Sequence, residues 1–286
     1  MTTPTITVFT PAYNRANTLI RLYNSLLAQT SYDFEWIIID DGSTDGTEDI
    51  VKYFTAPFDI RYTKKENGGK HTAYNLALTQ AHGKLFLCVD SDDILEKNAV
   101  KKLCLNAETE IGLCAYKSDF DGKLIGDVFP SIVNAVSVFE LNNKLGCRGE
   151  YTFVYPTEAA RKVPFPVFPG EKFVTESVIY DKLEKYCPVK LLPEIITICE
   201  YQPNGYSADT NKLMRENPAG YCLYFMQRID LVSWRQRFIF AGKYHCFAMM
   251  AGKRSNIYTG QHQATVALCR PLGLLFRLYY RIFRGF

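Results

Sequence analysis

Short apolar runs alternate with segments of helical periodicity along the first hundred residues. The runs predict strands at residues 5–11, 34–40, 60–65 and 85–89. Apolar positions at helical spacing predict helices between them, at residues 17–29, 47–54 and 70–83. Because strand and helix alternate through short connections, the pattern predicts βαβ units, a parallel sheet and right-handed crossovers.

The pattern is less regular after about residue 105. Strands are predicted at 111–116 and 190–201, and a helix at 174–186. Residues 210–250 are predicted to be helical and are rich in aromatic side chains. The chain has no internal repeat, low-complexity tract or evident interdomain linker.

Four polar clusters follow predicted strands. They are "TPAYNR" (10–15), "DDGSTD" (40–45), "ENGGKHTAYN" (66–75) and "DSDD" (90–93). In open parallel sheets, ligands bind outside the carboxyl ends of the strands. Four such clusters along one edge predict a binding site there.

The acidic cluster at 90–93 is typical of a metal site. Asp90 and Asp92 are two residues apart, so their side chains can point to one place if the strand continues. Mg²⁺ and Mn²⁺ bind one or two protein carboxylates and take other ligands from phosphate and water. We therefore expect a metal bound to a diphosphate. The alternatives are a solvated loop or a helix cap by Asp92 or Asp93, but a cap explains at most one of the three acids.

The other clusters contain groups suited to a nucleotide. Ser43 or Asp45 is interpreted as a helix cap, whereas Asp40 and Asp41 are not needed for capping. A carboxylate at that point accepts hydrogen bonds from a ribose hydroxyl or a base N–H.

A glycine pair followed by Lys70 at a helix start favours an anion, although the spacing is neither a dinucleotide fingerprint nor a P-loop. Lys70 is a candidate diphosphate contact. His71 and Asn75 are interpreted as structural.

Composition and cysteines narrow the class of protein. Apolar residues make up 47% and charged residues 22%, which is enough for a sizeable core. The nine cysteines are scattered without a C-x-x-C pair, and the first fifteen residues lack the apolar stretch of a signal peptide. These features predict a reducing, cytoplasmic location without a zinc site. No apolar run approaches the ~18 residues of a spanning helix.

Charge is distributed unevenly. Residues 1–230 carry 24 basic and 30 acidic side chains, a balance of −6, whereas residues 231–286 carry nine basic side chains and no acid. A basic tail predicts an anionic partner. In "CRPLGLLFRLYYRIFRGF" the arginines fall within about 60° of a helix surface, and the other faces are apolar.

That arrangement predicts a helix in a membrane interface through residues 268–286, too short to span. The alternatives are docking on the protein or a dimer contact. Nucleic acid is not expected as a partner, because the other faces of the tail are apolar.

"TPAYNR", "DDGSTDGT", "NGGKHTAYN" and "DSDD" together resemble the nucleotide-binding half of family 2 glycosyltransferases with the GT-A fold, over about residues 5–105. "GEKFVTES" and "EYQPNGYS" (200–207) resemble acceptor-half motifs of bacterial members that build cell-surface polysaccharides. The resemblance implies an α/β GT-A fold, with a mainly parallel central sheet flanked by helices and a helical C-terminal extension. Residues 1–105 would be the nucleotide-sugar-binding half, 106–207 the acceptor-binding half and 208–286 the basic extension.

The resemblance also implies roles for individual residues. Glu176 matches the catalytic base, although many relatives carry an acidic pair where this chain has Glu176 and Ser177. The position of Glu176 at a helix start has a structural explanation too, because a carboxylate is favoured there. Asp92 would hold Mn²⁺ or Mg²⁺. The implied nucleotide-binding residues are Pro11, Tyr13, Arg15, Asp41, Lys70 and Asp90.

The expected function is inverting transfer from a nucleotide diphosphate sugar, usually a UDP-sugar, to a hydroxyl of a glycan or lipid-linked saccharide. The expected location is the cytoplasm, with peripheral attachment to the inner face of the cytoplasmic membrane. Two other functions fit part of the pattern. A sugar nucleotidyltransferase would need a glycine-rich basic loop after the first strand, which "TPAYNR" is not. The second alternative is a homologue that binds nucleotide sugars but lacks a catalytic base.

Overall fold

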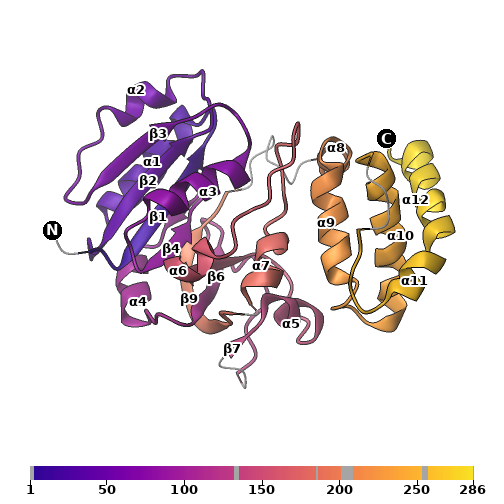
Figure 1. Cartoon of the computed structure of the whole chain (residues 1–286). Coiled ribbons are helices and arrows are strands. Elements are labelled where there is room, and N and C mark those ends of the chain that lie inside the picture. The colour runs from indigo at the N-terminus through magenta and orange to yellow at the C-terminus, as the bar shows by residue number, and fades with distance from the viewer. Residues whose placement is uncertain (1–2, 132–134, 185, 201–208, 253–256, 286) are drawn as a thin grey trace. The chain divides into compact units, whose positions relative to one another are not determined.

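The computed structural model describes residues 3–131, 135–184, 186–200, 209–252 and 257–285 (Figure 1). The chain divides into two compact units, and each is formed by two separate stretches. The first unit comprises residues 1–165 and 179–202, and it contains the sheet. The second comprises residues 166–178 and 203–286. The expected boundary at residue 208 lies outside the described residues.

Four parallel strands form one side of the sheet, as predicted. They are β1 (Ile6–Ala12), β2 (Phe34–Asp40), β3 (Ile60–Lys64) and β4 (Leu85–Cys88). Their order is β3-β2-β1-β4, and the predicted bounds differ from these by at most one residue. The carboxyl ends of the four strands therefore lie along one edge of the sheet, where the polar clusters begin.

The other side of the sheet is mixed. β8 (Tyr151–Pro156), which the pattern did not predict, lies antiparallel between β4 and β6 (Gly112–Ser118). β9 (Val189–Ile198) is parallel to β6, and the short β5 (Ile94–Leu95) and β7 (Ala135–Val136) are antiparallel to β9. The predicted α/β class, a central sheet flanked by helices as in GT-A folds, is confirmed.

Helices cover both faces of the parallel strands, because successive strand side chains point to opposite faces. On one face, leucines of α1 (Ala16–Leu27) join a core with Val8 and Trp36. On the other face, Tyr74 of α3 (Lys70–Gln80) packs edge-on against Phe9 at 5.9 Å between ring centroids. The remaining helices of this half are α2 (Thr47–Val51) and α4 (Ala99–Leu105).

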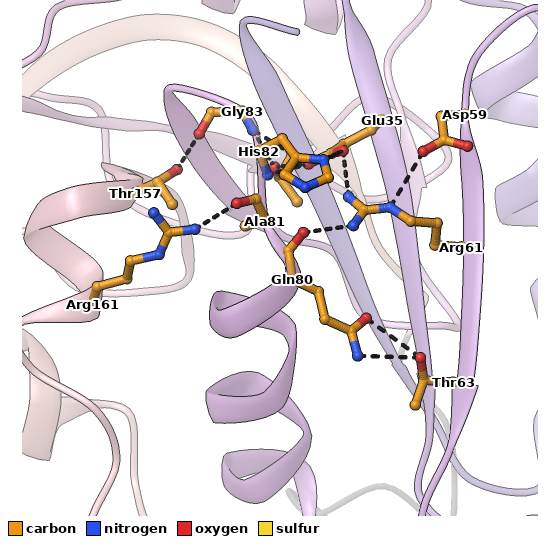
Figure 2. Close-up of polar contacts among 11 residues, drawn as sticks. Glu35, Asp59, Arg61, Thr63, Gln80, Ala81, His82, Gly83, Thr157 and Arg161 are labelled. Carbon is orange, nitrogen blue, oxygen red and sulfur yellow. Dashed lines mark hydrogen bonds and ion pairs between the residues drawn. The ribbon is translucent and has the colours of Figure 1, made fainter. Parts of the chain in front are cut away.

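A buried carboxylate ties three strands together near their amino ends (Figure 2). Glu35 of β2 accepts hydrogen bonds from Thr7 Oγ1 at 2.6 Å and from the backbone N–H groups of His82 at 2.6 Å and Gly83 at 3.2 Å. It also pairs with Arg61 of β3. Burial alone would raise the pKa of Glu35, but these hydrogen bonds and the charge of Arg61 outweigh it and lower that pKa.

The second unit is largely helical, as predicted for residues 210–250. Its core joins α9, α10 and α12, which lie side by side in Figure 1. Phe247 of α10 packs against Phe225 of α9 at 5.4 Å and Tyr280 of α12 at 5.7 Å between ring centroids. The helices after residue 208 are α8 (Thr210–Glu216), α9 (Pro218–Arg228), α10 (Trp234–Met250), α11 (Gln263–Leu268) and α12 (Arg270–Phe283).

Three shorter helices complete the described elements: α5 (Val138–Asn143), α6 (Thr157–Arg161) and α7 (Ser177–Leu183). α7 is the observed part of the helix predicted at 174–186. None of the helices in the described part of the chain combines the length and the apolar character needed to cross a membrane.

Candidate functional site

The four polar clusters meet at the carboxyl edge of β1 to β4. Each neighbouring pair of clusters is joined by a direct polar contact. These contacts are Asn14 N to Ser43 Oγ at 2.8 Å, Gly68 N to Asp41 Oδ1 at 2.9 Å, and Lys70 Nζ to Asp90 Oδ1 at 2.7 Å. The side chains that the sequence assigned to the nucleotide and the metal thus belong to one connected polar rim.

The first cluster forms a tight turn at the end of β1. Asn14 has a φ of 53°, and it is the one non-glycine residue with positive φ in the described ranges. Its side-chain oxygen accepts a hydrogen bond from Thr44 N at 2.8 Å, which holds this uncommon conformation. Tyr13 in this turn is half exposed, and Nη2 of Arg15 lies 3.8 Å from Oδ2 of Asp92.

Pro11 lies inside β1, which is an unusual place for proline in a central strand. The pairing of β1 with β4 ends at Phe9 and Cys88, so β1 has no β4 partner at Pro11. The missing N–H of Pro11 therefore leaves no ladder bond unmade, and its partly exposed ring lies beside the turn.

Asp41 organises the glycine pair at the start of α3. Its nearly buried carboxylate accepts hydrogen bonds from Gly68 N at 2.9 Å and Gly69 N at 2.7 Å, in addition to Lys65. Two of these bonds reach Oδ1 and one reaches Oδ2. Since each carboxylate oxygen has two lone pairs, Oδ2 keeps one acceptor position. Asp41 is thus a positioning group for this loop, with room for one further donor.

Asp45 binds both neighbouring helix starts. Its carboxylate accepts hydrogen bonds from Ala16 N at 3.0 Å, at the start of α1, and from Thr47 N at 3.1 Å, at the start of α2. This agrees with its interpretation as a cap. Asp40 is fully buried and accepts hydrogen bonds from Ser43 N at 2.7 Å and the Tyr62 hydroxyl at 2.5 Å.

The carboxylates of the acidic cluster differ in their ionisation. Burial opposes the ionisation of Asp90, but the charges of Lys70 and Lys117 outweigh it and lower the pKa of Asp90. For Asp92, burial and the neighbouring charge of Asp90 raise the pKa, and Arg15 offsets only part of this. An added cation would offset the burial and the charge of Asp90 that oppose the ionisation of Asp92.

Asp93 forms a buried ion pair with Lys117 of β6, at 3.4 Å. Burial raises the pKa of Asp93 to about 6. Helix α4 begins at Ala99, so neither Asp92 nor Asp93 caps it, and the capping alternative is wrong. Of the three acids in the cluster, Asp93 is the one with a clear structural role.

A metal at this edge would depend on few protein ligands. In the described ranges, no group of three or more His, Cys, Asp or Glu side chains is arranged to hold a metal ion. The partly exposed Asp92 beside Asp90 fits Mg²⁺ or Mn²⁺, which take most ligands from phosphate and water.

The two glutamates of "GEKFVTES" have different surroundings. Glu171 accepts hydrogen bonds from Ala219 N at 2.6 Å and Gly220 N at 2.8 Å, so it caps α9. Glu176 is partly exposed and directly precedes α7. Burial raises the pKa of Tyr221 to about 12, and the charge of Glu176 adds to this effect. Most of "EYQPNGYS" lies outside the described residues.

Asn75 and His71 of α3 contact Phe165. The Asn75 amide donates to Phe165 O and accepts from Phe165 N, both at 2.8 Å. The ring of His71 lies edge-on to Phe165 at 6.2 Å between centroids. These contacts support the structural interpretation of both side chains.

The structure adds four residues to this rim that the sequence interpretation missed. They are Asn14, Arg21, Lys65 and Lys117. Arg21 donates to the backbone oxygen of Asp92 at 3.3 Å and pairs with Glu200 at 2.6 Å. An Asn within a turn motif was a usable signal for Asn14, and a lysine pair after β3 was one for Lys65. Arg21 and Lys117 lie on elements far from the cluster in sequence and had no such signal.

A cavity of about 530 Å³ lies away from the rim, lined by Thr5 and Lys84, which precede β1 and β4, and by residues that follow α4. It lies toward the amino ends of the strands, and none of the four clusters lines it.

Residues 7–124 match the sequence model described as "Glycosyl transferase family 2". This segment contains the four clusters and β1 to β4. This segment is therefore similar in sequence to family 2 glycosyltransferases. The match to these residues, the family 2 segment, agrees with the resemblance inferred from the motifs.

Curated relatives share this part of the chain. Chondroitin synthase of Pasteurella multocida (strain Pm70) is 37% identical over 131 residues, which is 43% of this chain and 14% of that protein. Glycosyltransferase GlyA of Streptococcus pneumoniae is 32% identical over 146 residues, 47% of this chain and 21% of the relative. The chain thus spans about a fifth or less of the length of these relatives.

Solved structures share the fold over nearly the whole chain. S. aureus TarS 1–349 in complex with UDP-GlcNAc has a TM-score of 0.62 at 19% identity, covering 96% of this chain and 91% of that one. The mannosyltransferase PcManGT from Pyrobaculum calidifontis, in complex with GDP-Man and Mn²⁺, has a TM-score of 0.53 at 17% identity, covering 98% and 83%. The likeness at this identity concerns the fold.

Proposed function

We propose that the chain is an inverting glycosyltransferase that moves a sugar from a nucleotide diphosphate sugar, a UDP-sugar, to a hydroxyl of a glycan or lipid-linked saccharide in cell-surface polysaccharide synthesis. The observation that carries this is the connected rim, in which an exposed aromatic ring, two cations and two carboxylates of the family 2 segment surround one edge of the sheet. The similar structures that contain UDP-GlcNAc or GDP-Man support a nucleotide-sugar donor.

The nucleotide half of the donor would lie across the first three clusters. The exposed ring of Tyr13 offers a face for base stacking, with Pro11 beside it. The remaining acceptor position on Asp41 Oδ2 suits a base N–H or a ribose hydroxyl, and Asp90 would approach the ribose. Arg15 and Lys70 would then be positioned for the diphosphate.

Asp92, with Asp90 beside it, would hold a divalent cation, Mn²⁺ or Mg²⁺. When bound, the cation supplies Lewis-acid stabilisation of the charge on the leaving diphosphate. Without it, Arg15 and Lys70 already place two positive charges at the rim, 3.8 Å from Asp92 and 2.7 Å from Asp90 respectively. These side chains orient the diphosphate and offset part of its charge.

Glu176 would act as the general base. It accepts the proton of the acceptor hydroxyl while that oxygen forms a bond to the anomeric carbon, and the bond from the anomeric carbon to the diphosphate oxygen breaks. Attack from the face opposite the leaving group inverts the configuration of the anomeric carbon. The motif resemblance favours Glu176, and the other acid of the motif, Glu171, has a structural role as the cap of α9.

The test of the donor class is thermal unfolding of the full chain with UDP, GDP, CDP or dTDP, each with and without Mn²⁺. A ligand at ~100 times its dissociation constant stabilises the folded state by roughly 2.7 kcal/mol, which shifts the midpoint visibly. We expect a Mn²⁺-dependent shift with UDP that is much reduced in Lys70→Met. Lys84→Met is the matched control, because Lys84 lies toward the amino ends of the strands. No shift with any nucleotide would overturn the proposal.

A further inference from the structure

Helix α12 carries two separate apolar faces, and α10 covers one of them. Gly273 and Tyr280 are buried on the covered face. A side chain at Gly273 would meet His245 Cβ at 2.5 Å, and one at Gly242 of α10 would meet Leu272 Cγ at 2.7 Å. The two helices therefore pack closely through small residues, which fixes the rotation of α12 about its axis.

The second apolar face of α12 is exposed. Leu274, Leu275 and Ile282 are 60%, 62% and 61% exposed, and Leu278 and Tyr279 extend the same surface. At about 100° per residue, the centre of this face lies about 180° around the helix from the buried Gly273 and Tyr280. Because α12 packs closely on α10, it cannot rotate about its axis to bury this exposed face against the helices of its own unit.

Arginines border this exposed face. Arg270, Arg277, Arg281 and Arg284 are all exposed and lie within about 60° of the helix surface, between the covered face and the exposed apolar face. These arginines have no acidic neighbours in sequence, because residues 231–286 contain no Asp or Glu. A second copy of this tail would bring further arginines and no acid to pair with them.

We propose that this face of α12 binds an anionic lipid surface. The helix would lie in the plane of the interface, with leucine and isoleucine side chains among the acyl chains and arginines at the phosphate level. Its 14 residues are about 21 Å long, which is shorter than the ~30 Å hydrocarbon core and excludes a spanning role. Tyr279 lies on the exposed side, and an aromatic side chain of this kind is favoured at the membrane interface.

The test is flotation of the full chain with vesicles of phosphatidylcholine alone, or with about 30 mol% phosphatidylglycerol as anionic lipid. We expect binding to the anionic vesicles, much weaker binding to the neutral ones, and release at high salt. Arg277→Gln with Arg281→Gln should weaken partitioning about 30-fold, from about fivefold for each arginine. Leu274→Ser with Leu278→Ser should abolish it.

Leu105→Ser is the matched control, since Leu105 is 77% exposed on α4 and should leave flotation unchanged. All α12 variants change exposed side chains, so their thermal midpoints and UDP-induced shifts should equal those of the wild type. The lipid-binding inference can therefore be disproved without any effect on the proposed transferase function. Wild-type protein that does not float with anionic vesicles overturns the inference. The inference is also overturned if the wild-type protein is dimeric without lipid and the variant with Leu274→Ser and Leu278→Ser is monomeric.

Discussion

At the scale of single residues, the acidic cluster combines carboxylates of different kinds. Asp93 is paired with a buried lysine, whereas Asp92 is partly exposed and has a raised pKa caused by burial and by Asp90. The same short stretch thus contains a structural acid and a candidate metal ligand. Residue type alone does not separate them, because the distinction depends on Lys117 from another strand.

Asp92→Asn is expected to remove the Mn²⁺ dependence of nucleotide binding, because a neutral amide is a weaker ligand for a hard cation. Mn²⁺ affinity, measured by titration against the UDP-induced thermal shift, should fall at least about tenfold. Asp49→Asn is the control, since Asp49 is an exposed acid on α2 that pairs with Lys52. Equal Mn²⁺ affinity in Asp92→Asn and wild type would contradict the metal assignment.

At the scale of elements, the side chain of Glu35 adds contacts between strands near their amino ends. Its carboxylate receives bonds from β1, from β3 and from the segment between α3 and β4. These contacts set where β4 begins relative to β1, and so where its carboxyl end places Asp90. A buried group near one edge of the sheet thereby helps to position the site at the other.

Glu35→Gln should lower the free energy of unfolding at neutral pH by about 1 to 3 kcal/mol, because buried donors lose a charged acceptor. The pKa of Glu35 is lowered in the folded chain, so its ionised form stabilises the fold above the ordinary pKa of 4.5. This contribution is lost as the pH falls through the lowered value. Urea unfolding at several pH values should show the difference from wild type shrinking below about pH 4.5.

The control for this prediction is Glu110→Gln, because Glu110 is exposed. Its free energy of unfolding should stay within about 0.5 kcal/mol of the wild-type value at neutral pH. A Glu35→Gln difference that is the same at every pH would show that the ionised form of Glu35 does not contribute.

At the scale of the whole molecule, the proposed chemistry is divided between two units. The rim with Asp41, Lys70 and Asp92 belongs to the first unit, and the segment with Glu176 belongs to the second, together with α9 to α12. Donor binding and proton abstraction should therefore respond separately to substitution.

Glu176→Gln should keep the UDP- and Mn²⁺-dependent thermal shift and lose sugar transfer by about 10²- to 10⁴-fold, the usual contribution of a general base. Transfer is measured with radiolabelled UDP-sugars and a saccharide acceptor. The control is Glu216→Gln, an exposed acid of α8 in the same unit. A Glu176→Gln enzyme with wild-type transfer would exclude this residue as the base.

The sequence by itself determined the parallel half of the sheet and the composition of the rim, because strand runs, helical spacing and turn residues are local patterns. It also predicted the arginine-bearing apolar helix that the structure shows as α12 (Arg270–Phe283). Only the tertiary structure placed β8 between β4 and β6, since an antiparallel insertion depends on partners distant in sequence. The same holds for the pairing of Asp93 with Lys117. The tertiary structure also decided which apolar face of α12 is covered, through close packing on α10 at glycine residues. Periodicity within one helix does not specify such a contact between helices.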